Sequence, residues 1–192
     1  MTIIYGGSFN PPTIAHFEIA KYILDKFKEA DFYFLPTNNS YNKNGLDDFY
    51  LRVKMLDLLC ERLGSRARVS VFEGQLDKYY GTYYSLSHFQ DPYFVIGADN
   101  FKTITTWINY PKIVNDFKFI IIPRSSINIE EIFANDKDLR ETRNNFIVLD
   151  KFKEINLSSS EYRKTKNSNL LIDEVDSFIK QNNLYKEINN VS

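Results

Sequence analysis

Short runs of apolar residues alternate along the chain with longer segments in which apolar residues recur every three or four positions. The short runs have the length and the β-branched or aromatic character of buried strands. We predict six strands, at Thr2–Tyr5, Phe32–Leu35, Val69–Phe72, Tyr93–Ile96, Phe119–Ile122 and Phe146–Leu149. The helical spacing predicts helices over His16–Lys28, Phe49–Leu63 and Asp173–Leu184. Residues 123–145 are polar and poorly patterned, and we expect a loop with a short helix there.

This alternation of strands and helices is typical of an α/β protein. It predicts a Rossmann-like, doubly wound parallel sheet with helices on both faces. No flexible linker, internal repeat or low-complexity tract interrupts the pattern, so we expect residues 1–192 to form a single domain. Ligands of such sheets bind at the carboxyl ends of the strands. We therefore expect the loops that begin at Gly6 and Gly97 to face one crevice.

The composition narrows the class of protein. The chain has 192 residues, of which 43% are hydrophobic and 16% aromatic, enough for one α/β domain with a substantial core. A net charge of −1 gives no overall reason to expect a nucleic-acid partner. No apolar run is long enough to span a bilayer, and no secretory segment is recognisable, so no membrane partner is expected. The single cysteine, Cys60, cannot form an internal disulfide, and a reducing cytoplasm is the expected compartment.

The most informative segment is residues 6–16, which read Gly-Gly-Ser-Phe-Asn-Pro-Pro-Thr-Ile-Ala-His and follow the first apolar run. A strand leads into a glycine turn and then into a helix that begins near His16. This layout brings backbone N–H groups close to a phosphate and places an imidazole at a helix start. The glycine turn alone also fits an ordinary strand–loop–helix connection. The spacing of Phe9, Pro11, Thr13 and His16 after the glycines favours an enzyme that handles nucleotides.

A second segment, Leu157–Arg163, combines hydroxyl groups with a guanidinium group. It reads Leu-Ser-Ser-Ser-Glu-Tyr-Arg and predicts a hydroxyl-rich helix start with Arg163 about one turn into the helix. Exposed N–H groups, hydroxyls and a guanidinium together suit the phosphates of a nucleotide. The alternative is a capping box between Ser158 and Glu161. The presence of the first segment favours phosphate binding.

A third segment joins a carboxylate to an indole. Gly97-Ala98-Asp99 follows the fourth apolar run, and Trp107 lies eight residues after Asp99. A carboxylate accepts hydrogen bonds from ribose hydroxyls, and an indole offers a flat stacking face. The alternatives are that Asp99 caps the following helix and that Trp107 belongs to the core.

Together these segments resemble the nicotinate (nicotinamide) mononucleotide adenylyltransferase family, within the nucleotidyltransferases whose signature loop ends in His/Thr-x-Gly-His. Here that quartet is Thr13-Ile14-Ala15-His16, so Ala15 replaces the usual glycine. Residues 157–163 resemble the family's Ile-Ser-Ser-Thr-x-x-Arg segment, and residues 96–107 resemble its Ile-Gly-Ala-Asp…Trp segment. The three motifs occur in the right order, and the resemblance runs through most of the chain.

The resemblance implies adenylyl transfer from ATP to nicotinate mononucleotide, which gives deamido-NAD and pyrophosphate. It implies catalytic roles for His16, Thr13 and Arg163, although Thr13 also fits a plain helix cap. The residues implied for ATP binding are Gly6, Gly7, Ser8, Phe9, His16, Gly97, Asp99, Ser159, Ser160 and Arg163. Those implied for mononucleotide binding are Asn38, Lys43, Tyr83, Tyr84 and Trp107. We expect Mg²⁺ to arrive with the ATP phosphates, without a dedicated protein metal site.

One segment departs from the family pattern. The family usually has Ser-Tyr-Thr-x-Asp-Thr before the central strand, where the backbone meets the pyridine carboxylate. Residues 82–87 read Thr-Tyr-Tyr-Ser-Leu-Ser, in which Tyr83 matches the pattern while Tyr84 and Leu86 do not. Nicotinamide mononucleotide therefore stays an alternative substrate. Phosphopantetheine adenylyltransferases share the threonine of the first motif, and a nucleotide-binding regulator without catalysis is a further alternative. The sequence leaves homo-oligomerisation open.

Overall fold

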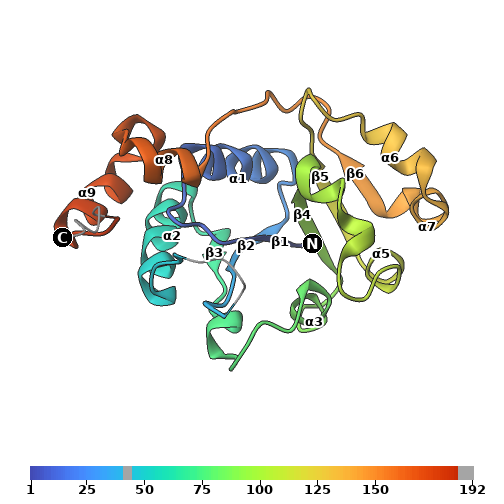
Figure 1. The fold of residues 1–192 in the computed structure, drawn as a ribbon, viewed down its shortest axis with the longest axis horizontal. Coiled ribbons are helices and arrows are strands. Elements are labelled where there is room, and N and C mark those ends of the chain that lie inside the picture. Colours follow the sequence, from blue (N-terminus) through green and yellow to red (C-terminus); the bar gives the residue numbers. More distant parts are fainter. Residues whose placement is uncertain (41–44, 186–192) are drawn as a thin grey trace, which may run out of the picture.

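The computed structural model describes residues 1–40 and 45–185, and a six-stranded parallel sheet lies at their centre (Figure 1). The strands are β1 Thr2–Gly7, β2 Asp31–Pro36, β3 Ala67–Val69, β4 Pro92–Gly97, β5 Lys118–Ile122 and β6 Phe146–Val148. Their order in the sheet is β3-β2-β1-β4-β5-β6, and each neighbouring pair is parallel. This is the strand order of the doubly wound Rossmann arrangement, and it confirms the predicted fold class.

Helices cover both faces of the sheet (Figure 1). One face is covered by α1 Ile14–Lys26, α2 Phe49–Leu63, α8 Ser159–Thr165 and α9 Asp173–Gln181. The other face is covered by α3 Thr82–Leu86, α4 Ala98–Phe101, α5 Lys112–Asp116, α6 Ile129–Asn135 and α7 Lys137–Glu141. Short 3-10 turns lie at Phe72–Gln75, Ile104–Thr106, Arg143–Asn145 and Ser168–Leu170.

Neighbouring residues of each central strand belong to different cores. In β1, Ile3 packs with α1 and α2, whereas Ile4 packs with the helices of the opposite face, and both are fully buried. Ile120 and Ile121 of β5 divide in the same way. Burial on both faces is the reason why these strands read as continuous apolar runs. Because β1 and β4 are parallel neighbours in the sheet, their carboxyl ends lie beside each other.

The third strand differs from the prediction. The run Val69–Phe72 was expected to be a strand, but the strand is Ala67–Val69, and Phe72 begins a 3-10 turn. Phe72 is apolar because it packs against the core from this turn, so its hydrophobicity does not reflect a place in the sheet. Pairing with β2 involves only Ala67, Arg68 and Val69, which leaves little pattern to detect.

The region 123–145 is more helical than predicted. It contains α6, α7 and a 3-10 turn, where one short helix was expected. The two helices have seven and five residues, too few for a clear 3.6-residue period. The side chains of Asn128 and Asp136 cap their N-termini, and these caps are the signal that the sequence did carry.

The bounds of the three predicted helices lie close to the observed ones. Helix α2 has the predicted bounds, α1 begins two residues earlier than predicted, and α9 ends three residues earlier. Burial raises the pKa of Cys60 to about 12, so its thiol is not a nucleophile at neutral pH. Within residues 1–40 and 45–185, we find no helix whose length and apolar character would let it cross a membrane.

Candidate active site

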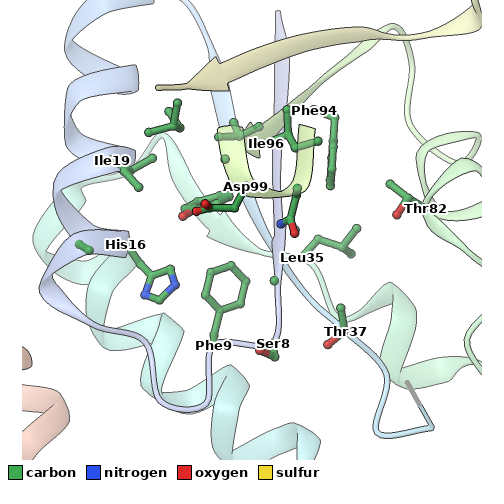
Figure 2. A pocket seen from close by; sticks show the side chains of 18 of the residues that line it. Ser8, Phe9, His16, Ile19, Leu35, Thr37, Thr82, Phe94, Ile96 and Asp99 are labelled. Carbon is green, nitrogen blue, oxygen red and sulfur yellow. The ribbon is translucent and has the colours of Figure 1, made fainter. Parts of the chain in front are cut away.

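A crevice of about 570 Å³ opens at the carboxyl ends of the strands, above the neighbouring β1 and β4. The strand order changes direction between these two strands, so the loops that follow them separate and leave a gap. The turn Gly6–Phe9 and the segment Gly97–Asp99 both line the crevice, as predicted. Figure 2 shows Phe9, His16 and Asp99 around this space.

The glycines of the first turn are required by two aromatic rings. A Cβ atom added to Gly6 would lie 2.8 Å from the ring of Phe94, and one added to Gly7 would lie 3.0 Å from the ring of Phe9. Phe9 is buried and has a φ of 45°, a left-handed conformation that is uncommon and strained for a residue with a side chain. Contacts from outside the turn must therefore hold it in place.

Side chains from α2 and α8 supply those contacts. Arg52 donates to the carbonyl oxygen of Ser8 at 2.7 Å, Arg163 to that of Asn10 at 2.6 Å, and the Ser159 hydroxyl to that of Pro11 at 2.7 Å. None of these three donors is among the residues that line the crevice. These three hydrogen bonds hold the backbone of residues 8–11 from outside the crevice lining.

This arrangement also shows where the second motif lies. Ser158 caps α8 by accepting from the N–H of Glu161, so half of the alternative capping box is present. Ser160 accepts from Arg163 Nη2 at 3.1 Å. The motif thus contacts the segment that follows the glycine turn, through Asn10 and Pro11. Ser159, Ser160 and Arg163 are outside the crevice lining, and their contact with phosphates stays a prediction.

His16 enters the crevice from the first turn of α1 (Figure 2). The backbone N–H of Thr13, the N-cap residue, donates to His16 Nδ1 at 2.9 Å, and Thr13 Oγ1 also lies 2.9 Å from that atom. Because Nδ1 accepts an N–H, its lone pair is used there, and the ring proton belongs on Nε2. Burial lowers the pKa of His16 to about 4, so the imidazole is neutral at pH 7.

Two neighbours of His16 also belong to the start of α1. Ala15 lies in the first turn of α1, where φ is negative, so replacing the family's glycine costs nothing in backbone strain. Thr13 is buried and is the cap residue of the helix, which agrees with the capping alternative. Its backbone nevertheless orients the imidazole, so its position matters whether or not its hydroxyl acts.

At one end of the crevice, a guanidinium lies between two carboxylates. Asp99 does not cap α4; its Oδ2 accepts from Arg124 Nε at 3.2 Å, and its side chain is 64% exposed. Arg124 Nη1 also lies 3.4 Å from Glu154 Oε1. All three residues line the crevice. Neither Arg124 nor Glu154 was among the predicted site residues, although Arg124 lies two residues after the apolar run that ends at Ile122.

The opposite end is formed by Gly81, Thr82, Trp107 and the end of β2. Trp107 is only partly buried and packs edge-on to Phe94 at 6.2 Å between ring centroids, so part of the indole faces the crevice. Tyr83 and Tyr84 are not in the lining. The Tyr83 hydroxyl donates to Asp116 at 2.7 Å, and the ring of Tyr84 packs at a tilt against the rings of Tyr80 and His88 on the surface.

The preceding residue, Thr82, lines the crevice in their place (Figure 2). The sequence did carry a signal for it. When the family pattern Ser-Tyr-Thr-x-Asp-Thr is moved by two residues, its two threonines fall on Thr82 and Ser85. The structure favours this register, because the buried Ser85 hydroxyl donates to Glu73 at 2.8 Å while Thr82 faces the crevice.

Asn38 joins two loops and does not reach the crevice. Its Nδ2 donates to the carbonyl oxygens of Glu73 and Leu76, and its Oδ1 accepts from the N–H of Ser40. Its own N–H donates to the Glu73 carboxylate, whose pKa burial raises. Lys43, the other residue predicted in this loop, lies outside the described residues. Residues 1–40 and 45–185 contain no cluster of three or more His, Cys, Asp or Glu side chains able to hold a metal ion.

Comparison with known proteins gives a consistent picture. Residues 4–165 match the model of the cytidylyltransferase-like family. A protein of Acholeplasma laidlawii (strain PG-8A) named "Probable nicotinate-nucleotide adenylyltransferase" is 34% identical over 98% of this chain and 99% of its own length. A protein of Oryza sativa subsp. japonica named "Nicotinamide/nicotinic acid mononucleotide adenylyltransferase" is 28% identical over 96% of this chain and 86% of its own.

The fold has a solved counterpart. The nicotinic acid mononucleotide adenylyltransferase of Plasmodium falciparum, solved in complex with NaAD, superposes with a TM-score of 0.76. It covers 96% of this chain and 96% of its own, at 23% identity. The likeness extends over the whole sheet and its helices and supports the doubly wound fold.

Proposed function

The chain belongs to the cytidylyltransferase-like family and, within it, to the nicotinate-nucleotide adenylyltransferases, and from this premise we propose how its crevice transfers the adenylyl group of ATP. The reaction joins ATP and nicotinate mononucleotide into deamido-NAD and pyrophosphate. The observation that carries the assignment of roles is the hydrogen bond from the Thr13 N–H to His16 Nδ1, because it leaves a neutral Nε2–H donor in the crevice.

In the proposed reaction, a phosphate oxygen of the mononucleotide attacks the α-phosphorus of ATP in line. The bond from the α-phosphorus to the bridging oxygen breaks as the new bond forms, and pyrophosphate leaves with that oxygen. His16 donates its Nε2–H to an α-phosphate oxygen on which charge grows. Such a preorganised donor acts on charge that develops in the transition state. The enzyme forms no covalent bond with the nucleotide, and catalysis comes from positioning and charge stabilisation.

The two ends of the crevice take the two nucleosides. Asp99 accepts from the ribose of adenosine, and Arg124 beside it holds the carboxylate in place. At the other end, Trp107 stacks on the pyridine ring, and the backbone of Gly81–Thr82 meets the pyridine carboxylate. The leaving pyrophosphate belongs at the start of α8, because Ser159 and Arg163 bring that helix start against the glycine turn.

We propose that Mg²⁺ enters the site bound to the phosphates of ATP. When bound, it neutralises charge on the triphosphate and orients the leaving group. Asp99 and Glu154 are both engaged with Arg124, so phosphate oxygens and water are the ligands that we propose for the ion. In this proposal the protein side chains contact the nucleotide, and none of them is a ligand of the metal ion.

Pyrophosphate release separates the candidate functions. With ATP and Mg²⁺, we expect the fastest release with nicotinate mononucleotide. Nicotinamide mononucleotide is the second candidate, because the rice relative is named for both compounds. Phosphopantetheine should give no release. Turnover with neither pyridine mononucleotide would overturn the proposal, and nucleotide binding without turnover would favour the regulator.

The neutral state of His16 predicts a flat pH profile. With a pKa near 4, His16 keeps its proton pattern at all higher pH values and gains a second ring proton only as the pH falls through about 4. We therefore expect kcat/KM, which reports the ionisations of the free enzyme, to show no histidine titration between about pH 5.5 and 8. His88→Gln is the matched control, since it removes the other histidine, which is exposed. A break near pH 6.5 that His16→Asn abolishes would contradict this assignment.

A further inference from the structure

A buried carboxylate beside the crevice has no part in the proposed reaction. Glu73 is 3% exposed and belongs to the 3-10 turn Phe72–Gln75. Its Oε2 accepts from the backbone N–H of Asn38 at 2.9 Å, and its Oε1 accepts from the Ser85 hydroxyl at 2.8 Å. A glutamate is almost never buried this deeply unless its oxygens have partners of this kind. The carboxylate therefore links two groups of the protein that belong to different elements.

The turn that carries Glu73 is held in place from several sides. A Cβ atom added to Gly74 would lie 2.2 Å from the ring of Phe49, so the turn packs directly on α2. The backbone carbonyl of Glu73 accepts from Asn38 Nδ2 at 2.7 Å. Phe72, the preceding residue, packs against the core on the α3 side of the sheet. The carboxylate thus has a fixed position, and the groups that it binds are placed relative to it.

One of the groups that Glu73 places is helix α3. This helix has five residues, too few to be stable without tertiary contacts. The Ser85 hydroxyl ties it to Glu73, and the Ser85 N–H donates to the carbonyl oxygen of Gly81 at 3.3 Å. The C=O and N–H groups of one planar, trans peptide point in opposite directions, so the bond to Gly81 also directs the N–H of Thr82. Two hydrogen bonds therefore lead from the carboxylate to the Gly81–Thr82 peptide, which borders the crevice (Figure 2).

The direction of this peptide matters for the choice between two mononucleotides. In the proposed function, the backbone of Gly81–Thr82 meets the pyridine carboxylate. A carboxylate accepts hydrogen bonds at both oxygens, whereas the carboxamide of nicotinamide mononucleotide has one accepting oxygen and one donating nitrogen. An N–H that is fixed in direction therefore favours the acid. A peptide that is free to rotate can present its carbonyl oxygen to the amide nitrogen instead.

We propose that Glu73 is a positioning residue that sets the preference for nicotinate over nicotinamide mononucleotide, by fixing the Gly81–Thr82 peptide through Ser85. This inference rests on the proposed function. Glu73 contacts no substrate atom in it and acts through the Ser85 hydroxyl. The inference also gives a role to Ser85, on which the second threonine of the shifted family pattern falls.

Changes at the two ends of the hydrogen bond test the proposal. Glu73→Met keeps about the size of the side chain and removes both accepting oxygens, whereas Ser85→Ala removes only the link to α3. For each, kcat/KM for nicotinate mononucleotide divided by kcat/KM for nicotinamide mononucleotide should fall about tenfold, the effect of one lost hydrogen bond. The KM for ATP should stay within about twofold of its original value. The double variant should have the ratio of the single variants, because both changes break the same bond.

Two conservative variants keep the link. In Glu73→Gln, the amide oxygen can accept from the Asn38 N–H while the amide nitrogen donates to Ser85, because a serine hydroxyl also accepts. In Ser85→Thr, the hydroxyl is kept. Both variants should retain the ratio of the unaltered enzyme to within about threefold.

A matched hydrogen bond away from the crevice provides the control. Ser168 Oγ donates to Asp176 Oδ1 at 2.8 Å, and neither residue lines the crevice. Ser168→Ala therefore removes a bond of the same kind and length as Ser85→Ala does. Both variants should lower the melting temperature, but Ser168→Ala should leave the ratio unchanged. If Glu73→Met folds poorly, Ser85→Ala tests the same link with the buried carboxylate still in place.

The outcomes separate this inference from the proposed function. An active, folded Ser85→Ala enzyme with an unchanged ratio would overturn the inference and leave the function standing. An equal fall in the ratio for Glu73→Gln and Glu73→Met would also overturn it, since the preference would then follow the charge of Glu73 and not the position of α3. If the unaltered enzyme used both mononucleotides equally well, the inference alone would fail. Release of pyrophosphate with neither would overturn the function together with the inference.

Discussion

Replacing His16 with alanine is expected to lower kcat by roughly two to three orders of magnitude, the effect of losing one preorganised donor to a developing oxyanion. The structure gives this donor its direction, because the Thr13 N–H occupies Nδ1 and leaves the proton on Nε2. It also gives its charge state, because burial keeps the imidazole neutral at pH 7. Pyrophosphate release at saturating ATP and nicotinate mononucleotide measures the loss.

Thr13 provides the matched control for this experiment. Its backbone N–H donates a hydrogen bond that fixes the imidazole tautomer, and its hydroxyl lies 2.9 Å from the same Nδ1. Thr13→Val keeps that N–H, so kcat should fall by less than about tenfold while the lost hydroxyl costs about 1 kcal/mol of stability. A large fall in kcat for Thr13→Val would instead make its hydroxyl part of the catalytic machinery. His16→Ala with more than about a tenth of the original turnover would rule out the proposed role of His16.

The sequence predicted the sheet because the fold buries its central strands on both faces. Ile3 and Ile4 face different cores, so β1 leaves no polar position to obscure the run. Helix α2 was predicted with its correct bounds because Asp48 caps its start through two N–H groups and Gly64 ends it at a φ of 92°. Short elements were predicted less well: β3 was predicted with the wrong bounds, and α7 was not predicted as a separate helix. Three to five residues carry too little periodicity to define an element.

The position of the crevice was predictable from topology, but the direction of each side chain was not. Parallel strands bring their carboxyl ends to one edge, so the loops after Gly6 and Gly97 were placed correctly. In the loop after β2, Asn38 was predicted to bind the mononucleotide, but its neighbour Thr37 lines the crevice, and the bond that turns Asn38 away joins it to Glu73, 35 positions along the chain. Such long-range bonds leave no local pattern in the sequence.

Arg52 shows how far such bonds support the site. Its side chain is fully buried and donates to the carbonyl oxygens of Ser8, Thr37 and Asp47 and to Asn39 Oδ1. Burial lowers the pKa of the guanidinium, which as an arginine side chain keeps its charge in proteins. We expect Arg52→Leu to lower the free energy of unfolding by about 3–5 kcal/mol, because it leaves three buried carbonyl groups without donors.

Arg52→Leu should also weaken the binding of both substrates, because Arg52 joins the loop after β1 to the loop after β2. Without it, the left-handed conformation of Phe9 and the position of Thr37 lose a common support, so the KM values for ATP and for the mononucleotide should both rise. Arg52→Lys keeps the charge but cannot donate to four separated acceptors, and we expect an intermediate loss.

Arg66 is the matched control for Arg52, because it also donates to backbone carbonyl groups, those of Leu24 and Phe27 at the end of α1, away from the crevice. Arg66→Leu should cost about 1–2 kcal/mol of stability in chemical denaturation and leave both KM values unchanged. If Arg52→Leu behaved in the same way, the guanidinium would stabilise the fold without shaping the crevice. A rise in both KM values at a temperature where the Arg52 variant is still fully folded would instead show that this buried charge sets the geometry of the two loops.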